Sequence, residues 1–405
     1  MVREMDFVDE CYADKDLSQL KKLTLVIPTY NRNYYLSRCL WYHAHFPFGQ
    51  IIVADSSPEE KKVVNRETVA KVREMFGADI LYLEYEPETE KYGGDVYRKW
   101  NSAVQNAGTE FSLICIDKSF LIPTTLVSLI DILDSHGEYV SARGIEASLC
   151  EKRYNPIGRY YFQKSSRKNT IDGDTGVERI KNVILTESPW KCTQLFSITR
   201  TTIHKRIYAL LEKYTIPDIR YGEVMLAFFG HLYGKEYVSQ EISSIRDLRQ
   251  ISKLNAKARV NLSESSSSRY PARDVLNKEK PEFFEYFKLS LLGELKQYTD
   301  TIGGDSIEFL RNLTIEDMSH FSVNISKETR LRNKFDKIYS IYTICSEFAP
   351  QVIIKCLLCL LKNRNMPTPP EPITTRNRDE FELFVRIIMQ SLICESNDKP
   401  ISYFQ

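Results

Sequence analysis

The chain has 405 residues, a length that suits two or three domains. Hydrophobic residues make up 42% and charged residues 27%, values that argue against a collagen, a simple coiled coil or a disordered chain. Lys and Arg number 55 against 54 Asp and Glu, so the net charge is +1. Proteins that bind a nucleic-acid backbone usually carry a clear positive excess, so we expect no nucleic-acid partner.

The sequence also predicts a compartment. The first residues lack the charged and then apolar layout of a signal peptide, and no run of about 18 apolar residues predicts a transmembrane span. The 9 cysteines are scattered and odd in number, which favours a reduced, cytoplasmic protein. Cys356 and Cys359 lie in an apolar stretch with basic edges. A buried helix is the favoured interpretation there, and peripheral contact with a membrane is the minor one.

Short apolar runs alternate with amphipathic segments in the first 120 residues. Strands are predicted at 23–27, 51–54, 80–83 and 111–116, and helices at 32–42, 59–76 and 96–107. This alternation predicts an α/β fold, with a mostly parallel sheet and helices on both faces. In such sheets a ligand binds beyond the carboxyl ends of the strands.

The rest of the chain is less regular. We expect helices at 126–133, 202–214 and 222–233, strands at 139–142 and 194–198, and a mobile flap over 151–182. Apolar residues from 276 to 405 recur at helical spacing, which predicts a helical C-terminal domain. The predicted organisation is a lead-in over 1–20, an α/β domain over 21–250, a Ser-rich linker over 251–275 and the helical domain over 276–405.

Polar residues follow the predicted strands at the points where a ligand would lie. The first strand ends in Pro28-Thr29-Tyr30-Asn31-Arg32, the second in Asp55-Ser56-Ser57, and the fourth is followed by Asp117-Lys118-Ser119. Tyr97-Arg98-Lys99-Trp100-Asn101 lies on the third predicted helix. In this order and spacing, the segments resemble the family 2 glycosyltransferases, and most nearly a bacterial subgroup with an Asp-Asp-Asp-Phe motif. The resemblance covers about residues 21–145.

The resemblance implies a GT-A domain of the Rossmann-like type that binds a nucleotide-sugar donor. The residues that it implies for donor binding are Pro28, Thr29, Tyr30, Asn31, Arg32, Asp55, Ser56, Lys99, Asp117 and Lys118. The Asp55 carboxylate is suited to accept hydrogen bonds from the base or the ribose. Pro28 and Asn31 are also common turn residues, so an ordinary turn at the end of a strand is the alternative for this loop.

The acidic motif departs from the pattern of the family. Its members place two or three carboxylates here, and these bind Mn²⁺ or Mg²⁺ on the donor diphosphate. In this chain only Asp117 is acidic, because Lys118 and Ser119 follow it. Three interpretations stay open: the Lys118 ammonium replaces part of the charge of the metal, Asp117 holds a weak metal that depends on the nucleotide, or the protein is a degenerate, slow or inactive relative.

Inverting transfer also needs a general base near the acceptor hydroxyl. The resemblance places this base near the start of a late helix, where the segment 219–227 matches, and there Glu223 is the first candidate and Asp218 the second. The alternative for Glu223 is a carboxylate that stabilises the first turn of its helix. Trp190 is suited either to stack on an acceptor sugar or to pack in a core.

Three arginines are weaker candidates for contact with the diphosphate. They are Arg143, Arg246 and Arg249, and a solvated charge cluster is the favoured alternative for each of them. The predicted function is transfer of a sugar from a nucleotide-sugar to a saccharide or lipid-linked saccharide, in the assembly of a surface polysaccharide such as capsule or O-antigen. The location would be cytoplasmic, or peripheral at the inner face of the membrane. The alternative function is a catalytically degenerate nucleotide-binding or interaction module.

Overall fold

The structure is a computed structural model that describes residues 12–90, 93–151, 160–164, 170–176, 178–180, 182, 195–213 and 219–247. The linker and the helical C-terminal domain predicted above lie outside these residues, as does most of the predicted flap. So do five residues singled out in the sequence, namely Trp190, Asp218, Arg249, Cys356 and Cys359.

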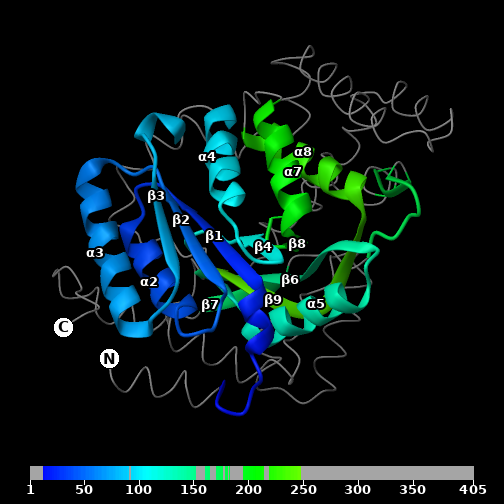
Figure 1. Cartoon of the computed structure of the whole chain (residues 1–405), viewed down its shortest axis with the longest axis horizontal. Coiled ribbons are helices and arrows are strands. Elements are labelled where there is room, and N and C mark those ends of the chain that lie inside the picture. The colour runs from blue at the N-terminus through cyan, green and yellow to red at the C-terminus, as the bar shows by residue number, and fades with distance from the viewer. Residues whose placement is uncertain are drawn as a thin grey trace, which may run out of the picture.

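The described strands form one 9-stranded sheet (Figure 1). The strands are β1 (Leu23–Thr29), β2 (Gln50–Asp55), β3 (Ile80–Glu84), β4 (Phe111–Ile114), β5 (Ser119–Leu121), β6 (Tyr139–Glu151), β7 (Tyr160–Lys164), β8 (Ile198–Arg200) and β9 (Lys235–Asp247). Their order is β3-β2-β1-β4-β8-β6-β9-β5, and β7 pairs with β6. The first four strands pair in parallel, as do β6 and β9, whereas the pairs β4–β8, β6–β8, β6–β7 and β5–β9 are antiparallel.

Helices cover both faces of this sheet (Figure 1). The helices are α2 (Asn33–His43), α3 (Glu59–Phe76), α4 (Gly93–Gln105), α5 (Pro123–Ser135), α7 (Thr201–Lys213) and α8 (Ile219–Tyr233), with short 3-10 turns η1 (Ser18–Lys22) and η2 (Pro87–Glu90). Helices α2, α3 and α5 share one hydrophobic core, and α4, α7 and α8 share another. The predicted α/β class, with a mostly parallel sheet between helices, is therefore confirmed.

The apolar run of β1 explains why its strand lies at the centre. Alternate residues of a strand point to opposite faces, and in β1 both sets are apolar. Leu25 and Ile27 lie in the core beneath α2 and α3, whereas Val26 lies in the core beneath α4 and α8. A strand that is buried on both faces needs such a continuous run, which is typical of parallel sheets.

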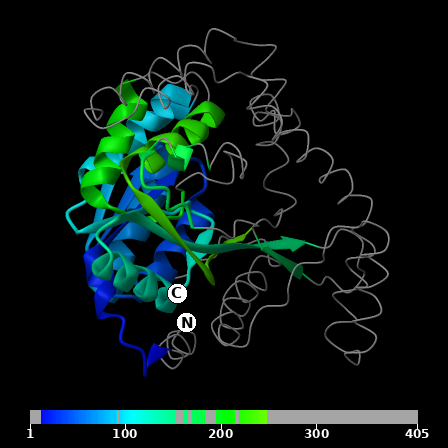
Figure 2. The same cartoon turned by 90° about the vertical axis from the view of Figure 1, so that its right-hand side faces the viewer.

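Two strands differ from the prediction, and three were not predicted. Strand β6 continues to Glu151 rather than ending at 142, β8 begins at Ile198 rather than at 194, and β5, β7 and β9 are new. Strand β7 lies within the range 151–182 that was predicted as a mobile flap, and it pairs with β6. Strand β9 was not predicted because it lacks an apolar alternation: Glu236, Ser243 and Ser244 are polar and yet buried. Its long pairing with β6, visible in Figure 2, stabilises a strand that local propensity does not favour.

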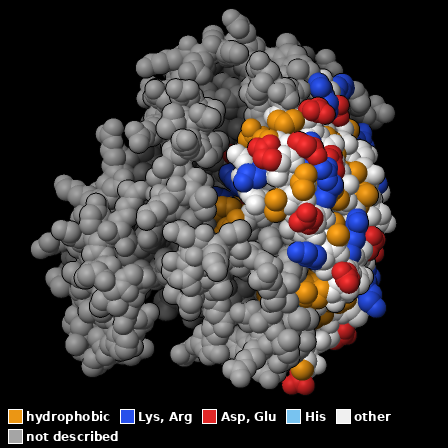
Figure 3. Space-filling view, turned by 90° about the vertical axis from the view of Figure 1, so that its left-hand side faces the viewer, with side chains coloured by type: hydrophobic (Ala, Val, Ile, Leu, Met, Phe, Trp, Pro, Cys, Tyr) orange, Lys and Arg blue, Asp and Glu red, His pale blue; other side chains and the backbone are white. Residues whose placement is uncertain are grey.

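The outer face of α3 shows how charge is distributed on the described surface. Acidic and basic side chains are interspersed on this side of the molecule rather than gathered by sign (Figure 3). One example is Arg66, which forms ion pairs with both Glu59 and Glu84. Exposed pairs of this kind stabilise a protein by at most about 1 kcal/mol each. This face therefore suits ordinary solvation better than binding of a highly charged partner.

Candidate functional site

Asp117 is the centre of the site at the carboxyl ends of β1 and β4. The Thr29 hydroxyl donates to its Oδ2 at 2.9 Å, and Arg32 Nη1 lies 3.3 Å from its Oδ1. The side chain of Asp117 is 2% exposed, whereas that of Arg32 is 42% exposed. Burial raises the pKa of the Asp117 carboxyl, and the charge of Arg32 and the Thr29 hydrogen bond oppose this rise. Asp117 thus orders the first loop from below, and Arg32 carries positive charge to the surface.

Lys118 lies beside Asp117 and next to the end of β9. The Asp247 N–H donates to the Lys118 carbonyl at 2.9 Å, and Ser119 pairs with Arg246 where β5 meets β9. Burial lowers the pKa of the Lys118 ammonium, and the charges of Arg32 and Arg246 lower it further. Three cations therefore meet at this edge of the sheet. We call Arg32, Lys118 and Arg246 the cationic cluster.

Arg246 is held in place before any ligand arrives. Its Nη2 donates to a Glu146 carboxylate oxygen at 2.7 Å, and its guanidinium lies over the Phe196 ring, 5.0 Å from the centroid. Phe196 has a φ of 66°, a left-handed conformation that costs a bulky residue roughly 1–2 kcal/mol. Such strain is found where the surrounding structure requires it, often at functional sites. The arginine is therefore pre-oriented beside Lys118, rather than free in solvent.

Asp55 organises the carboxyl end of β2. It is 0% exposed, and it accepts hydrogen bonds from the Ser57 N–H at 2.7 Å, from Asn65 Nδ2 at 2.6 Å and from the Tyr82 hydroxyl at 2.5 Å. Burial and the Asp55 carboxylate raise the pKa of the Tyr82 hydroxyl. In this arrangement Asp55 fixes the side chains around it, and its direct contact with a nucleoside stays a prediction.

Lys99 joins the first two loops from beneath. It is 2% exposed, and its Nζ donates to Ser56 Oγ at 2.8 Å and lies 3.5 Å from the Thr29 carbonyl oxygen. Ser56 itself is 0% exposed, and its N–H donates to the same carbonyl at 3.2 Å. Lys99 and Ser56 therefore hold the ends of β1 and β2 together rather than reaching the surface.

The exposed part of the first loop is short. Pro28 and Thr29 are buried in β1, whereas Tyr30, Asn31 and Arg32 are exposed. Asn31 adopts a φ of 54°, which asparagine tolerates better than most residues, and its N–H donates to Ser57 Oγ at 2.8 Å. This left-handed residue turns the chain sharply and so directs the following arginine back over Asp117.

Glu223 lies on the other side of α4. The neighbouring Gly222 packs directly on Tyr97, since a Cβ at this glycine would stand 1.9 Å from the tyrosine ring. The charge of Glu223, together with burial, raises the pKa of the Tyr208 hydroxyl on α7. Tyr97 is two residues from Lys99, in the half of α4 that lies near the carboxyl ends of β1 and β2. The glutamate is therefore on α8, which shares one hydrophobic core with α4 and α7.

A divalent cation does not fit the residues present. The described residues contain no group of three or more His, Cys, Asp or Glu that could hold a metal ion. Asp117 is 1% exposed, and each of its oxygens already contacts a protein donor. Ser119 is 0% exposed, and its hydroxyl makes no hydrogen bond within the part of the chain described. His43, the other candidate nearby, accepts from the Leu121 N–H and contacts the Cys39 carbonyl, so its role is structural.

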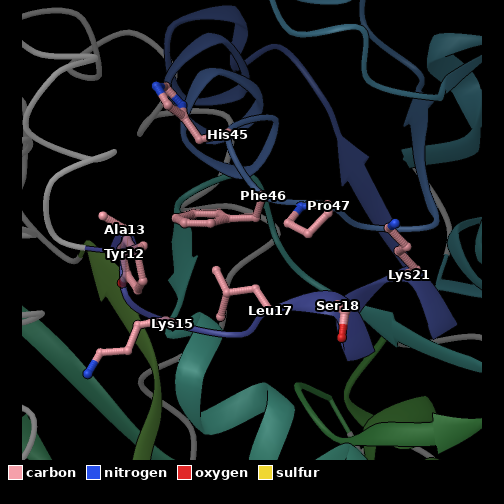
Figure 4. A pocket seen from close by; sticks show the side chains of 9 residues that line it. All are labelled: Tyr12, Ala13, Lys15, Leu17, Ser18, Lys21, His45, Phe46 and Pro47. Atoms are coloured by element: carbon pink, nitrogen blue, oxygen red, sulfur yellow. The ribbon is translucent and has the colours of Figure 1, made fainter.

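A hollow of about 560 Å³ lies elsewhere, beside η1 (Figure 4). Its lining residues include Tyr12, Leu17, Lys21, His45 and Phe46. Because η1 leads directly into β1, this hollow is at the amino end of that strand. It is therefore on the opposite edge of the sheet from Asp117 and takes no part in the site.

The structure thus separates the predicted residues into three groups. Thr29, Arg32, Asp117 and Lys118 meet at the surface edge, Asp55, Ser56 and Lys99 are buried supports, and Glu223 stands across α4. The solvated charge cluster favoured for Arg246 is not what the structure shows, because this residue is on β9 and packed on Phe196. Tyr82 was missed, although the parallel register of β2 and β3 places it near Asp55.

Comparisons with known proteins give a limited result. No family model matches the chain, and no curated protein matches it. Among solved structures, S. aureus TarS 1-349 matches with 16% identity and a TM-score of 0.37, covering 76% of this chain and 91% of that chain. The same protein in complex with UDP has a TM-score of 0.39, and in complex with UDP-GlcNAc 0.38, each at 16% identity over 76% of this chain. These two matches cover 91% and 92% of those chains. Likenesses of this size assign no function to the chain.

No helix in the described part of the chain combines the length and the apolar character that a membrane-spanning helix requires.

Proposed function

We propose that residues 21–250 form a glycosyltransferase domain that binds a nucleoside-diphosphate sugar at the carboxyl edge of β1, β2 and β4. The observation that carries the proposal is geometric: Arg32 in the exposed loop contacts Asp117, Lys118 follows Asp117 directly, and Arg246 pairs with Ser119 where β5 meets β9. Positive charge at the carboxyl ends of parallel strands is suited to phosphate groups. The order of the segments along the chain, and their resemblance to family 2 glycosyltransferases, support a sugar nucleotide over other phosphate compounds.

In the proposed reaction the acceptor hydroxyl oxygen attacks the anomeric carbon of the donor sugar. A new C–O bond forms as the bond between this carbon and the diphosphate oxygen breaks, and the nucleoside diphosphate leaves with both electrons of that bond. The hydroxyl proton passes to the carboxylate of Glu223. The cationic cluster stabilises the negative charge that develops on the leaving diphosphate. Attack from the side opposite the leaving group inverts the anomeric configuration.

The test is release of nucleoside diphosphate from a panel of nucleotide sugars in the presence of saccharide acceptors. We expect Glu223→Gln to lower turnover by roughly 100-fold or more, while nucleotide affinity stays nearly unchanged, since the amide cannot take a proton. Glu67→Gln, the same substitution on the exposed face of α3, is the matched control and should leave turnover unchanged. A Glu223→Gln variant with full turnover would remove this residue as the base.

The resemblance supports a saccharide or lipid-linked saccharide used in surface polysaccharide assembly, with the enzyme at or near the inner face of a membrane. An acceptor panel of free oligosaccharides and lipid-linked saccharides, each tested with the same donor, separates the two classes. Transfer to the lipid-linked acceptors alone would support work beside a membrane.

One observation favours a second candidate, a nucleotide-binding module without catalysis. Lys118 and Ser119 stand where the family carries further carboxylates, so a metal-dependent enzyme would have lost its metal site. This candidate predicts binding of nucleoside diphosphates without transfer or hydrolysis of any donor. Turnover of a single nucleotide sugar would exclude it.

A further inference from the structure

We infer that Arg32, Lys118 and Arg246 hold the donor diphosphate in place of a divalent cation, so that binding and transfer need no metal. This inference rests on the proposed function, since it concerns the same site. It goes beyond that function by stating that these three side chains replace the metal, so that Mn²⁺ and Mg²⁺ are not required. Four observations support it, two on the cations and two on the carboxylates around them.

The first observation is that Lys118 has no anionic partner. In the part of the chain described, no carboxylate lies within ion-pair distance of its ammonium, although Asp117 and Asp247 act on it from further away. Arg32 and Arg246 add positive charge beside it. A half-buried ammonium that feels the charge of two guanidinium groups is unfavourable by itself. A diphosphate relieves this repulsion and replaces the water that burial removed, so the cluster is better matched to a multiply charged anion than to solvent.

The second observation is that Arg246 is already oriented for such a ligand. Its contacts with Glu146 and Phe196 occupy one side of the guanidinium, and its Nε is buried without a hydrogen-bond partner among the residues described. A buried charged donor that lacks a partner costs free energy, which binding of an acceptor oxygen recovers. The planar fork of an arginine is also well suited to phosphate oxygens.

The third observation concerns Asp117, the residue on which a metal would depend. Its Oδ1 contacts Arg32 and its Oδ2 accepts from Thr29, and the side chain is 2% exposed. Divalent Mg²⁺ and Mn²⁺ prefer several oxygen ligands with regular geometry. The Asp117 carboxylate instead orders the cation that faces the ligand.

The fourth observation is that two carboxylates near Lys118 in the fold already have arginine partners. Asp247 is held by Arg38 at 3.2 Å, with side chains 3% and 1% exposed, and Glu146 is held by Arg246. The Asp247 carboxylate on β9 and the Glu146 carboxylate on β6 are therefore each paired with an arginine rather than with Lys118. The positive charge of Lys118 is therefore available to neutralise a diphosphate. In the family pattern the metal ion has this role.

The test uses the full chain and titration calorimetry with UDP, dTDP, GDP and ADP, each in EDTA and each with MnCl₂. We expect the diphosphate that binds tightest to keep its affinity in EDTA within about twofold. Lys118→Ala should weaken that diphosphate roughly tenfold to 100-fold and the matching monophosphate much less, as expected for loss of one charge-assisted contact. Lys22→Ala removes an exposed lysine at the opposite edge of the sheet and should change neither affinity.

A second variant tests the inference in the opposite direction. Lys118→Asp places a second carboxylate beside Asp117, so it should lose binding in EDTA and regain part of it with MnCl₂. Binding by the unchanged chain that disappears in EDTA and returns with MnCl₂ would overturn the inference and leave the proposed function standing. Failure of all four diphosphates to bind under either condition would instead overturn the proposed function itself. Tryptophan fluorescence of each variant checks that it is folded.

Discussion

The ion pair of Arg38 and Asp247 offers a sharp test of how the end of β9 is held. Arg38 Nη1 lies 3.2 Å from Asp247 Oδ2, and the two side chains are 3% and 1% exposed. The Arg38 guanidinium also lies 5.3 Å from the centroids of Tyr34 and Phe120. Asp247→Asn would leave this cation buried without its counter-ion. Breaking a buried pair on one side costs about 3–5 kcal/mol, and we expect a loss of stability in this range.

The pair as a whole should contribute much less than the loss of one partner costs. Both ions gave up hydration on folding, and the Nε and Nη2 of Arg38 are buried without hydrogen-bond partners in the described part of the chain. Replacing both residues by apolar ones of similar volume removes these penalties together. We therefore expect Arg38→Met with Asp247→Leu to be within about 1 kcal/mol of the natural protein, or more stable.

Denaturant unfolding followed by tryptophan fluorescence measures these changes, since Trp41 and Trp100 lie one in each hydrophobic core. Asp134→Asn is the control, because it breaks the ion pair between Asp134 and Lys22. In this pair the Lys22 side chain is 39% exposed and the Asp134 side chain 27%. That variant should lose no more than about 1 kcal/mol. If Asp247→Asn lost as little as the control, the pair would be hydrated and the reasoning from burial would be refuted.

Two further predictions concern packing and pH. Gly222→Ala should destabilise the protein by about 1–3 kcal/mol, because the new methyl group overlaps the fully buried Tyr97 ring. Gly108→Ala is the control: a Cβ at Gly108 has no atom within 4 Å, so stability should change by less than about 0.5 kcal/mol in the same unfolding assay. Burial lowers the pKa of His204 to about 3, so between this value and the ordinary 6.5 the unfolded chain binds more protons than the folded one. Stability should therefore fall by up to about 4–5 kcal/mol as the pH drops through this range. His204→Gln should flatten that part of the pH profile of unfolding. His136→Gln, which replaces a half-exposed ring, is the control and should leave the profile unchanged. If His204→Gln left the profile unaltered, another group would cause the loss of stability in acid.

The sequence predicted the parallel half of the sheet well. Strands β1 to β4 are short apolar runs, and helix α3 was predicted at the same bounds that the structure shows, Glu59–Phe76. These elements are encoded locally, because burial on both faces requires continuous apolar residues and a helix requires its periodicity. Since parallel strands end at one edge, the same patterns also placed Thr29, Arg32 and Asp117 together.

Other features depended on contacts between distant segments. Whether Asp55 and Lys99 face a ligand or lie beneath it is decided by the packing of Asn65, Tyr82 and Ser56 around them, and residue type alone does not determine that depth.

By itself, then, the sequence determined the class of fold and the edge of the sheet at which the polar strand ends gather, because hydrophobic patterns and strand direction are properties of short segments. Only the tertiary structure decided that Arg246 belongs with Lys118. Strands β5 and β9 carry weak local signals, and the pairing of Ser119 with Arg246 joins parts of the chain that lie far apart in the sequence. The physical reason is that a strand is stabilised by its neighbours in the sheet, so the residues of one strand do not by themselves determine which strand it pairs with.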